Sequence, residues 1–287
     1  MKKTLALGIS VLLSYSMLQA SEKINLVVPY KPGGNGLKVA KALEEPLKAK
    51  GWDVNFLSLG DCTNAKGFIS STSEKTMFIW DTGFFPNNSK AEDICHVETP
   101  TNKTLIAGVY ERPDYICSVG KDVDIMTKDL GEITIGTGAN KLPESQKKLI
   151  TDGIPSKVRF VQYENSGAIT TAIAAKEIDF SYDHMGKKAE KNGQAKCHYN
   201  TSNEVIGETK PFNSVIPNFG TRKTVVYLDS VNIDVKTKEK LSKDVFEIIQ
   251  TSPELTELFN NTGVFKFKEN SDVVKEIKNE FDISSKL

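Results

Sequence analysis

Short β-branched runs alternate along this chain with longer segments in which apolar residues recur at helical spacing. The first pair is INLVVPY at 24–30, which predicts a strand, and LKVAKALEEPLKAKG at 37–51, which predicts a helix. The helical stripe consists of Val39, Ala40, Leu43 and Leu47. Gly51 suits the C-terminal end of this helix. Because an interior proline removes a hydrogen bond and kinks a helix, we expect a bend or an early end at Pro46.

The alternation continues to the C-terminus. Strands, or strands followed by helices, are expected at 52–59, 76–83, 104–119, 131–150, 157–177, 178–184 and 223–230, and helices through 237–287. Such alternation favours parallel sheets of the α/β class. With 287 residues and 39% hydrophobic content, the chain is long for one domain. We therefore predict an α/β fold with two lobes.

Glycine-rich turns follow two of the expected strands, at 32–36 and 136–140. In an open parallel sheet, ligands bind at the carboxyl ends of the strands, and glycines let backbone N–H groups approach them. The following helix adds its positive N-terminal end, which suits an anion such as a carboxylate. The alternative is that each turn is only a connector. The GTG at 136–138 lacks the third glycine of a dinucleotide fingerprint, and 33–38 lacks the Lys-Ser/Thr of a P-loop, so we expect no nucleotide cofactor.

The N-terminus predicts export. Lys2 and Lys3 precede an apolar run that ends near Ala20, which is typical of a cleaved signal peptide over residues 1–20. Its removal leaves 35 basic residues (37 minus 2) against 37 acidic ones, a net charge of about −2. This balance argues against nucleic-acid binding. No later apolar run is long enough to span a bilayer, so we expect a soluble, exported protein.

Three stretches together resemble one family of receptors. NLVVPYKPGGNGLKVAKALEEPLKAKGW looks like the first strand, loop and helix of the solute receptors of tripartite tricarboxylate transporters, the Bug receptors. GEITIGTGAN is similar to their second ligand loop. VRFVQYENSGAITTAIAAKEIDFSYDH resembles their later segment, where a tyrosine-containing loop leads a helix toward an Asp at a strand end. The resemblance spans essentially the whole mature chain.

The resemblance implies a two-lobed periplasmic binding protein, type II or Venus-flytrap, with a hinge between two α/β domains. It implies a monomer without cofactor or catalytic group that captures a small organic anion, a carboxylate, and delivers it to integral-membrane transporter subunits. The solute itself stays open, because Leu37 replaces the Asp usual in the family. The ligand residues carried over are Tyr30, Gly33, Gly34, Asn35, Asp81 and Thr82 in the first lobe and Thr137, Gly138, Asn140, Ser166, Gly167 and Asp183 in the second.

The domain boundaries and the cysteine pairing follow from this fold. The chain is expected to cross between lobes near 115–119 and 197–202, which assigns 21–115 and 200–287 to domain 1 and 116–199 to domain 2. Export permits disulfides, and Cys62, Cys95, Cys117 and Cys197 allow three pairings. We favour Cys62 with Cys95, and Cys117 with Cys197 at the hinge, because the fold brings these segments close. The spacing of the cysteines and of their neighbouring histidines does not predict a metal site.

Two other functions are open. An enzyme needs a base beside a nucleophile, and the histidines available are His96, His184 and His198. No G-x-S-x-G or H-E-x-x-H motif is present, and Asp183 with His184 is the one pair suited to acid–base work in a secreted hydrolase. A receptor of an ATP-driven (ABC) importer has the same two-lobed architecture and differs in its membrane partner.

Overall fold

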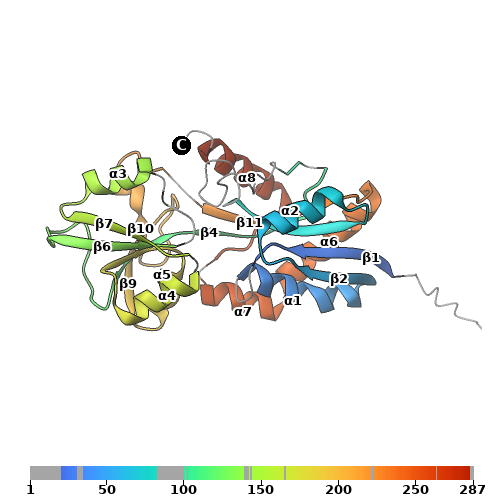
Figure 1. The fold of residues 1–287 in the computed structure, drawn as a ribbon, viewed down its shortest axis with the longest axis horizontal. Coiled ribbons are helices and arrows are strands. Elements are labelled where there is room, and N and C mark those ends of the chain that lie inside the picture. Colours follow the sequence, from blue (N-terminus) through green and yellow to red (C-terminus); the bar gives the residue numbers. More distant parts are fainter. Residues whose placement is uncertain are drawn as a thin grey trace, which may run out of the picture.

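The computed structural model describes residues 21–30, 35–82, 100–101, 103–138, 142, 144–164, 166–220, 223–262 and 264–284. Two sheets lie side by side along the long axis of the molecule, and helices cover each of them (Figure 1). The α/β fold with two lobes is therefore confirmed. The predicted signal peptide lies outside the described residues. In the part that is described, no helix is both long enough and apolar enough to cross a membrane.

The first sheet has five strands of mixed direction. Their order is β2 (Trp52–Ser58), β1 (Glu22–Val28), β3 (Thr76–Asp81), β11 (Lys223–Val231) and β4 (Ala107–Pro113). β1 pairs in parallel with β2 and β3, but β11 runs antiparallel to β3 and β4. The expectation of a parallel sheet is wrong here, because β11 returns from the second sheet and enters from the end at which β4 leaves.

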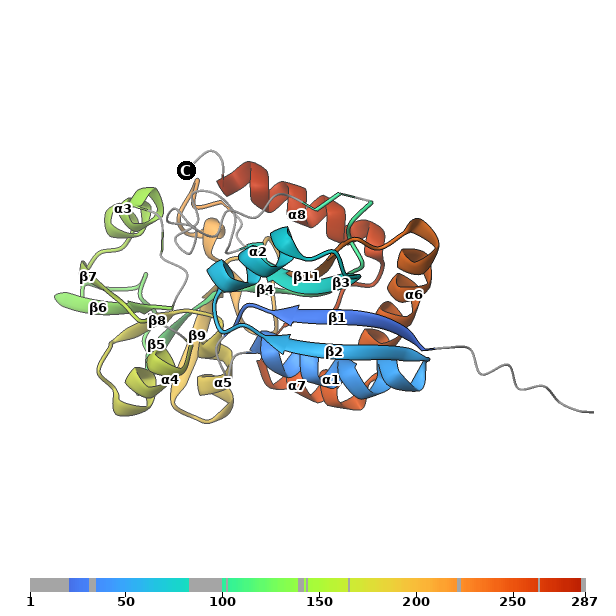
Figure 2. The ribbon, with the colours of Figure 1, turned by 45° about the vertical axis from the view of Figure 1, so that its right-hand side comes forward.

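Helices cover both faces of the first sheet, as Figure 2 shows from a second side. Ile24, Leu26 and Val28 of β1 pack into one core, while Val27 points into the other, as the two-residue period of a strand requires. The first core also holds residues of α1 (Asn35–Ala49), α6 (Val235–Thr251) and α7 (Pro253–Thr262). The second holds residues of α2 (Cys62–Ser71) and α8 (Asn270–Ser284).

Helix α1 continues through Pro46 and ends at Ala49, so the early end expected at the proline is not observed. Pro46 lies in the last turn, where its carbonyl still accepts from the N–H of Lys50 at 3.2 Å. A missing N–H therefore affects only one hydrogen bond near the end of the helix. Gly51 follows with φ of +89°, the left-handed conformation that a glycine adopts readily after a helix.

The second sheet has six strands, again of mixed direction. Their order is β10 (Lys210–Pro211), β9 (Ala195–Asn200), β5 (Tyr115–Val119), β8 (Phe180–Tyr182), β6 (Glu132–Thr137) and β7 (Lys157–Gln162). Its helices are α3 (Glu144–Gly153), α4 (Ser166–Ala175), α5 (Met185–Lys191) and the 3-10 helix η3 (Phe212–Ser214). β6 pairs in parallel with β7 and β8, whereas β5 is antiparallel to β8 and β9.

The chain passes between the sheets at two places. Asp114 alone separates β4 of the first sheet from β5 of the second. On the return, Phe212, Ile216 and Phe219 still pack in the core of the second sheet. The division into 21–115 plus 200–287 and 116–199 stays a prediction, and this packing would move its second boundary from 200 to after 219.

The disulfide between Cys117 and Cys197 is confirmed. It joins β5 to β9, two adjacent antiparallel strands of the second sheet. The disulfide therefore lies within one sheet, and the expectation that it joins the two crossing segments at the hinge stays a prediction, as the domain boundaries do. Cys62 is also disulfide-bonded, and Cys95, its expected partner, lies outside the described residues.

Candidate functional site

Strand ends from both sheets meet at the β4–β5 crossing. In the first sheet, β3 ends at Asp81, which aligns through β11 with Tyr110 of β4. In the second sheet, Asp183 directly follows β8, and its backbone exchanges hydrogen bonds with Tyr115 at 3.1 and 3.4 Å. Thr137, the last residue of β6, is in register with Tyr182. The topology therefore brings carboxyl ends of strands in the two lobes to one place, where α/β proteins bind ligands.

Arg112 lies where these strand ends of the two sheets meet. It is the penultimate residue of β4, it is half-buried, and within the described residues its guanidinium makes no hydrogen bond or ion pair. Burial lowers its pKa, but four nearby groups raise it by more, so the net shift is upward. Those groups, in order of effect, are Tyr110, Asp114, Asp183 and Asp81. Arg112 is thus a cation whose charge interacts with carboxylates of both lobes.

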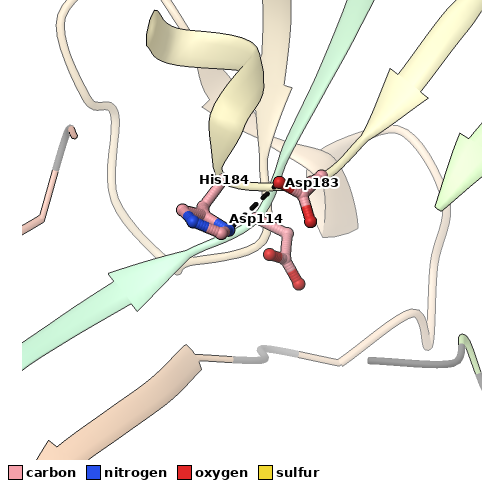
Figure 3. Close-up of side chains that lie close together, drawn as sticks. All are labelled: Asp114, Asp183 and His184. Carbon is pink, nitrogen blue, oxygen red and sulfur yellow. Dashed lines mark ion pairs between the residues drawn. The ribbon is translucent and has the colours of Figure 1, made fainter. Parts of the chain in front are cut away.

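Asp114, Asp183 and His184 form a compact group beside Arg112 (Figure 3). One ligand atom from each of the three lies within 4.8 Å of the others, and Asp183 and His184 are buried. Burial raises the pKa of Asp183, but His184, Arg112 and the backbone N–H of Met185 lower it by more, which gives a net downward shift. Asp183 is therefore held as a carboxylate. Among the described residues, this group is the one that gathers three possible metal ligands.

The first-lobe residues Tyr30 and Asp81 form one unit. The Tyr30 hydroxyl donates to Oδ2 of Asp81 at 2.9 Å, although 51 residues separate them. Burial, followed by the charge of Asp81, raises the pKa of Tyr30 well above its usual range, so the hydroxyl remains a donor. Gly36 leaves room for the Tyr30 ring, because a Cβ there would come within 2.3 Å of ring carbons. Thr82 is buried, and its hydroxyl accepts from the N–H of Val225.

In the second lobe, Gly138 fits tightly against Asp183. A Cβ at position 138 would lie 1.9 Å from Oδ2 of Asp183, so only glycine fits beside the carboxylate as placed. Thr137 before it is buried. Ser166 is the first residue of α4, and Gly167, the second, is exposed. Gly138, directly after β6, therefore lies against the carboxylate at the end of β8.

The structure describes some of the predicted ligand residues and not others. The structure brings Tyr30 to Asp81 and Gly138 to Asp183. Asn35 is the first residue of α1, whereas Gly33, Gly34 and Asn140 lie outside the described residues. That these side chains and turns contact a ligand stays a prediction.

The sequence interpretation missed Arg112, Asp114 and the binding potential of His184. The available signal was ERPD at 111–114, which sits directly before YICSV, the expected crossing into the second lobe. Arg112 is also one of only three arginines in a chain whose other basic residues are lysines. An arginine at a lobe crossing is well suited to a carboxylate, since its fork of donors matches the two oxygens.

Comparison with known proteins identifies the fold. No protein-family model matches the chain, and no curated protein matches its sequence. Among solved structures, a TctC solute-binding protein from Polaromonas matches with a TM-score of 0.68 and 14% identity over 94% of this chain and 100% of its own. The periplasmic binding protein BugD matches with 0.66 and 14% over 92% and 96%, and malate-bound MatC from Rhodopseudomonas palustris with 0.63 and 12% over 92% and 98%. The chain therefore has the two-lobed fold of the TctC and Bug solute-binding proteins.

Proposed function

We propose that this chain is an exported, periplasmic receptor that captures a small organic carboxylate between its two sheets and delivers it to the membrane subunits of a tripartite tricarboxylate-type transporter. The likeness of fold supports this proposal. Two of the similar structures contain dicarboxylates, adipate in one R. palustris protein and malate in MatC. The role carries no catalytic step, in keeping with the solute-binding proteins that the fold resembles.

The observation that carries the proposal is the half-buried guanidinium of Arg112. Cations at such positions normally have a hydrogen-bonding or ionic partner, because burial without one is costly. Arg112 has no such partner among the described residues, and it lies where strand ends of the two lobes meet. A ligand carboxylate on Arg112 would supply the missing hydrogen bonds. The turns after β1 and β6, including Gly33, Gly34 and Asn140, remain the expected backbone donors.

Isothermal calorimetry on the purified protein tests this function. We expect at least one small mono- to tricarboxylate to bind, and Arg112→Gln to weaken that binding by about tenfold or more, the value of a charge-assisted hydrogen bond. Arg159→Gln is the matched control, because Arg159 lies on β7 and donates to Thr134 instead. Equal affinities of the Arg112 variant and the wild type would contradict the proposal.

The membrane partner is a separate part of the proposal. A receptor of an ATP-driven importer is the alternative, and the genes beside this one distinguish the two systems. A large and a small multi-spanning membrane protein support the tripartite system, whereas a neighbouring ATPase contradicts it.

A further inference from the structure

The pairing of β5 with β9 is irregular close to the β4–β5 crossing. Ile116 pairs with Tyr199. The next residue of β5, Cys117, pairs with Cys197 and not with His198, which is therefore an extra residue on β9. This arrangement is a β-bulge, which bends the strand that carries it and is frequent beside functional sites. On one side of the bulge lies the disulfide, and on the other lies the end of β9 that faces the crossing.

The disulfide fixes the register on the first side of the bulge. Cys117 and Cys197 are direct neighbours across the two strands, and both are buried. A covalent bond between opposed residues resists a slip of β9 along β5. Such a slip by one residue would turn the side chains of the strand to the opposite face of the sheet.

Thr201 fixes the register on the other side of the bulge. Its N–H donates to the carbonyl of Asp114 at 3.0 Å, and its hydroxyl accepts from the N–H of Asp114 at 2.9 Å. Thr201 is 1% exposed, so these hydrogen bonds are shielded from water. Without the bulge, the register at Cys117 and Cys197 would place Asn200 opposite Asp114 instead of Thr201. The bulge is thus held at both ends, by a covalent bond and by two hydrogen bonds to the crossing residue.

Asp114 transmits this constraint to the candidate site. It is the single residue between β4 and β5, so its backbone links the strand of Arg112 to Tyr115 in the second sheet. Tyr115 exchanges backbone hydrogen bonds with Asp183 at 3.1 and 3.4 Å. The side chains of Asp114 and Asp183 lie close together (Figure 3), and both raise the pKa of Arg112. A shift of Asp114 would therefore change the spacing of the charges that a ligand meets.

On the basis of the proposed function, we propose that Thr201 and the Cys117–Cys197 disulfide are positioning residues for ligand binding. They act through Asp114, because together they hold the bulged end of β9, and with it the crossing, in the geometry that the ligand needs. Binding to a preorganised site costs less than binding to one that must first be ordered, so loss of either anchor lowers the affinity. A purely structural role predicts instead that affinity changes only in proportion to stability.

Calorimetry on a set of matched variants tests the role of Thr201. Malate, adipate, succinate and citrate are screened on the wild type, and the tightest binder serves as the probe for every variant. Thr201→Val removes the hydroxyl at nearly constant volume and should weaken binding of the probe by about fivefold or more. Thr201→Ser keeps the hydroxyl and should bind the probe within about twofold of the wild type.

Ser156→Ala is the control for the loss of a buried hydroxyl. Ser156 is 4% exposed, and its hydroxyl accepts from the N–H of Leu130 at 2.9 Å, as the Thr201 hydroxyl does from Asp114. It directly precedes β7, whereas the candidate site lies at the opposite ends of the strands. Ser156→Ala should therefore lower the urea midpoint and leave the affinity within about twofold of the wild type.

A disulfide-free variant tests the second anchor independently. Cys117→Ala with Cys197→Ala should also weaken binding of the probe by about fivefold or more. Ile150→Ala is its control, because Ile150 is buried on α3, outside the β5–β9 pair, and its truncation destabilises the core of the second sheet. Circular dichroism checks that each variant is folded at the temperature of the binding measurement.

The outcomes separate this proposal from the proposed function. An unchanged affinity in Thr201→Val or in the disulfide-free variant overturns the positioning role and leaves the proposed function intact. Equal losses in Thr201→Val and Thr201→Ser, or in the two control variants, also overturn it, because the effect would then follow stability and not the anchors. A wild type that binds none of the four carboxylates contradicts the proposed function, and with it this proposal.

Discussion

Replacement of Gly138 by alanine should disturb the candidate site through one contact. The new Cβ would lie 1.9 Å from Oδ2 of Asp183, and real Cβ contacts are essentially never shorter than 3.0 Å, so the carboxylate and the backbone at 138 must separate by at least 1.1 Å (3.0 minus 1.9). Asp183 has little freedom to do so. Its Oδ1 accepts from the N–H of Met185 at 2.8 Å, and its backbone pairs with Tyr115. Overpacking of this kind costs about 1–3 kcal/mol.

Gly67→Ala is the matched control for Gly138→Ala. Gly67 lies in α2, and a Cβ there meets nothing within 4 Å, so alanine should stabilise the helix by about 0.5–1 kcal/mol. Urea denaturation followed by far-UV circular dichroism measures both changes, and the two midpoints should move in opposite directions. A midpoint for Gly138→Ala equal to or above that of the wild type, with an unchanged slope, would refute the tight fit of this turn against Asp183.

Two further predictions concern stability. Burial raises the pKa of Asp229 to about 6 from 3.8, so its contribution to stability is fully present below the unfolded value and is lost as the pH rises through about 6. Asp229→Asn should therefore raise the free energy of unfolding at pH 7 by up to about 3 kcal/mol and leave it unchanged near pH 3. Equal effects at both pH values would contradict the raised pKa of Asp229. The double substitution Cys117→Ser and Cys197→Ser removes the disulfide between residues 80 apart in sequence and should lower the free energy of unfolding by about 4 kcal/mol. A lower urea midpoint measures this loss, and an unchanged midpoint would contradict a structural role for the disulfide.

Local pattern was sufficient to predict most elements of the first sheet, but not their direction. The strand Lys223–Val231 was predicted from KTVVYLDS, yet a two-residue period is the same for parallel and antiparallel strands. Helix α2 was missed because its apolar residues, Cys62, Ala65, Phe68 and Ile69, are few and stand among polar residues and a glycine, and only Ala65 is fully buried. β9 was missed for a related reason, since half of AKCHYN is polar and none of its residues is β-branched.

The candidate site shows a different limit of prediction from the sequence. Asp81, Tyr30 and Asp183 were predicted from the family resemblance, and the structure shows the Tyr30–Asp81 hydrogen bond that the resemblance did not specify. The resemblance assigned no role to Arg112, and the position of ERPD before the expected crossing was a weaker signal. Its position between the two sheets depends on β4 ending at the crossing, which is a property of the whole fold rather than of ERPD. Residues whose role depends on long-range topology are therefore the ones that a pattern analysis misses.

The placement of the charges on the two sheets has a consequence for closure. Arg112 belongs to the first sheet, whereas Asp183 and His184 follow a strand of the second. A ligand that contacts only one of these groups gains nothing from bringing the lobes together, and it cannot shift an equilibrium between open and closed forms. A ligand that accepts from Arg112 and also contacts the strand ends of the second sheet binds both sheets, so its full affinity exists only when both sheets are within reach. Binding to both sheets at once would then favour the closed form.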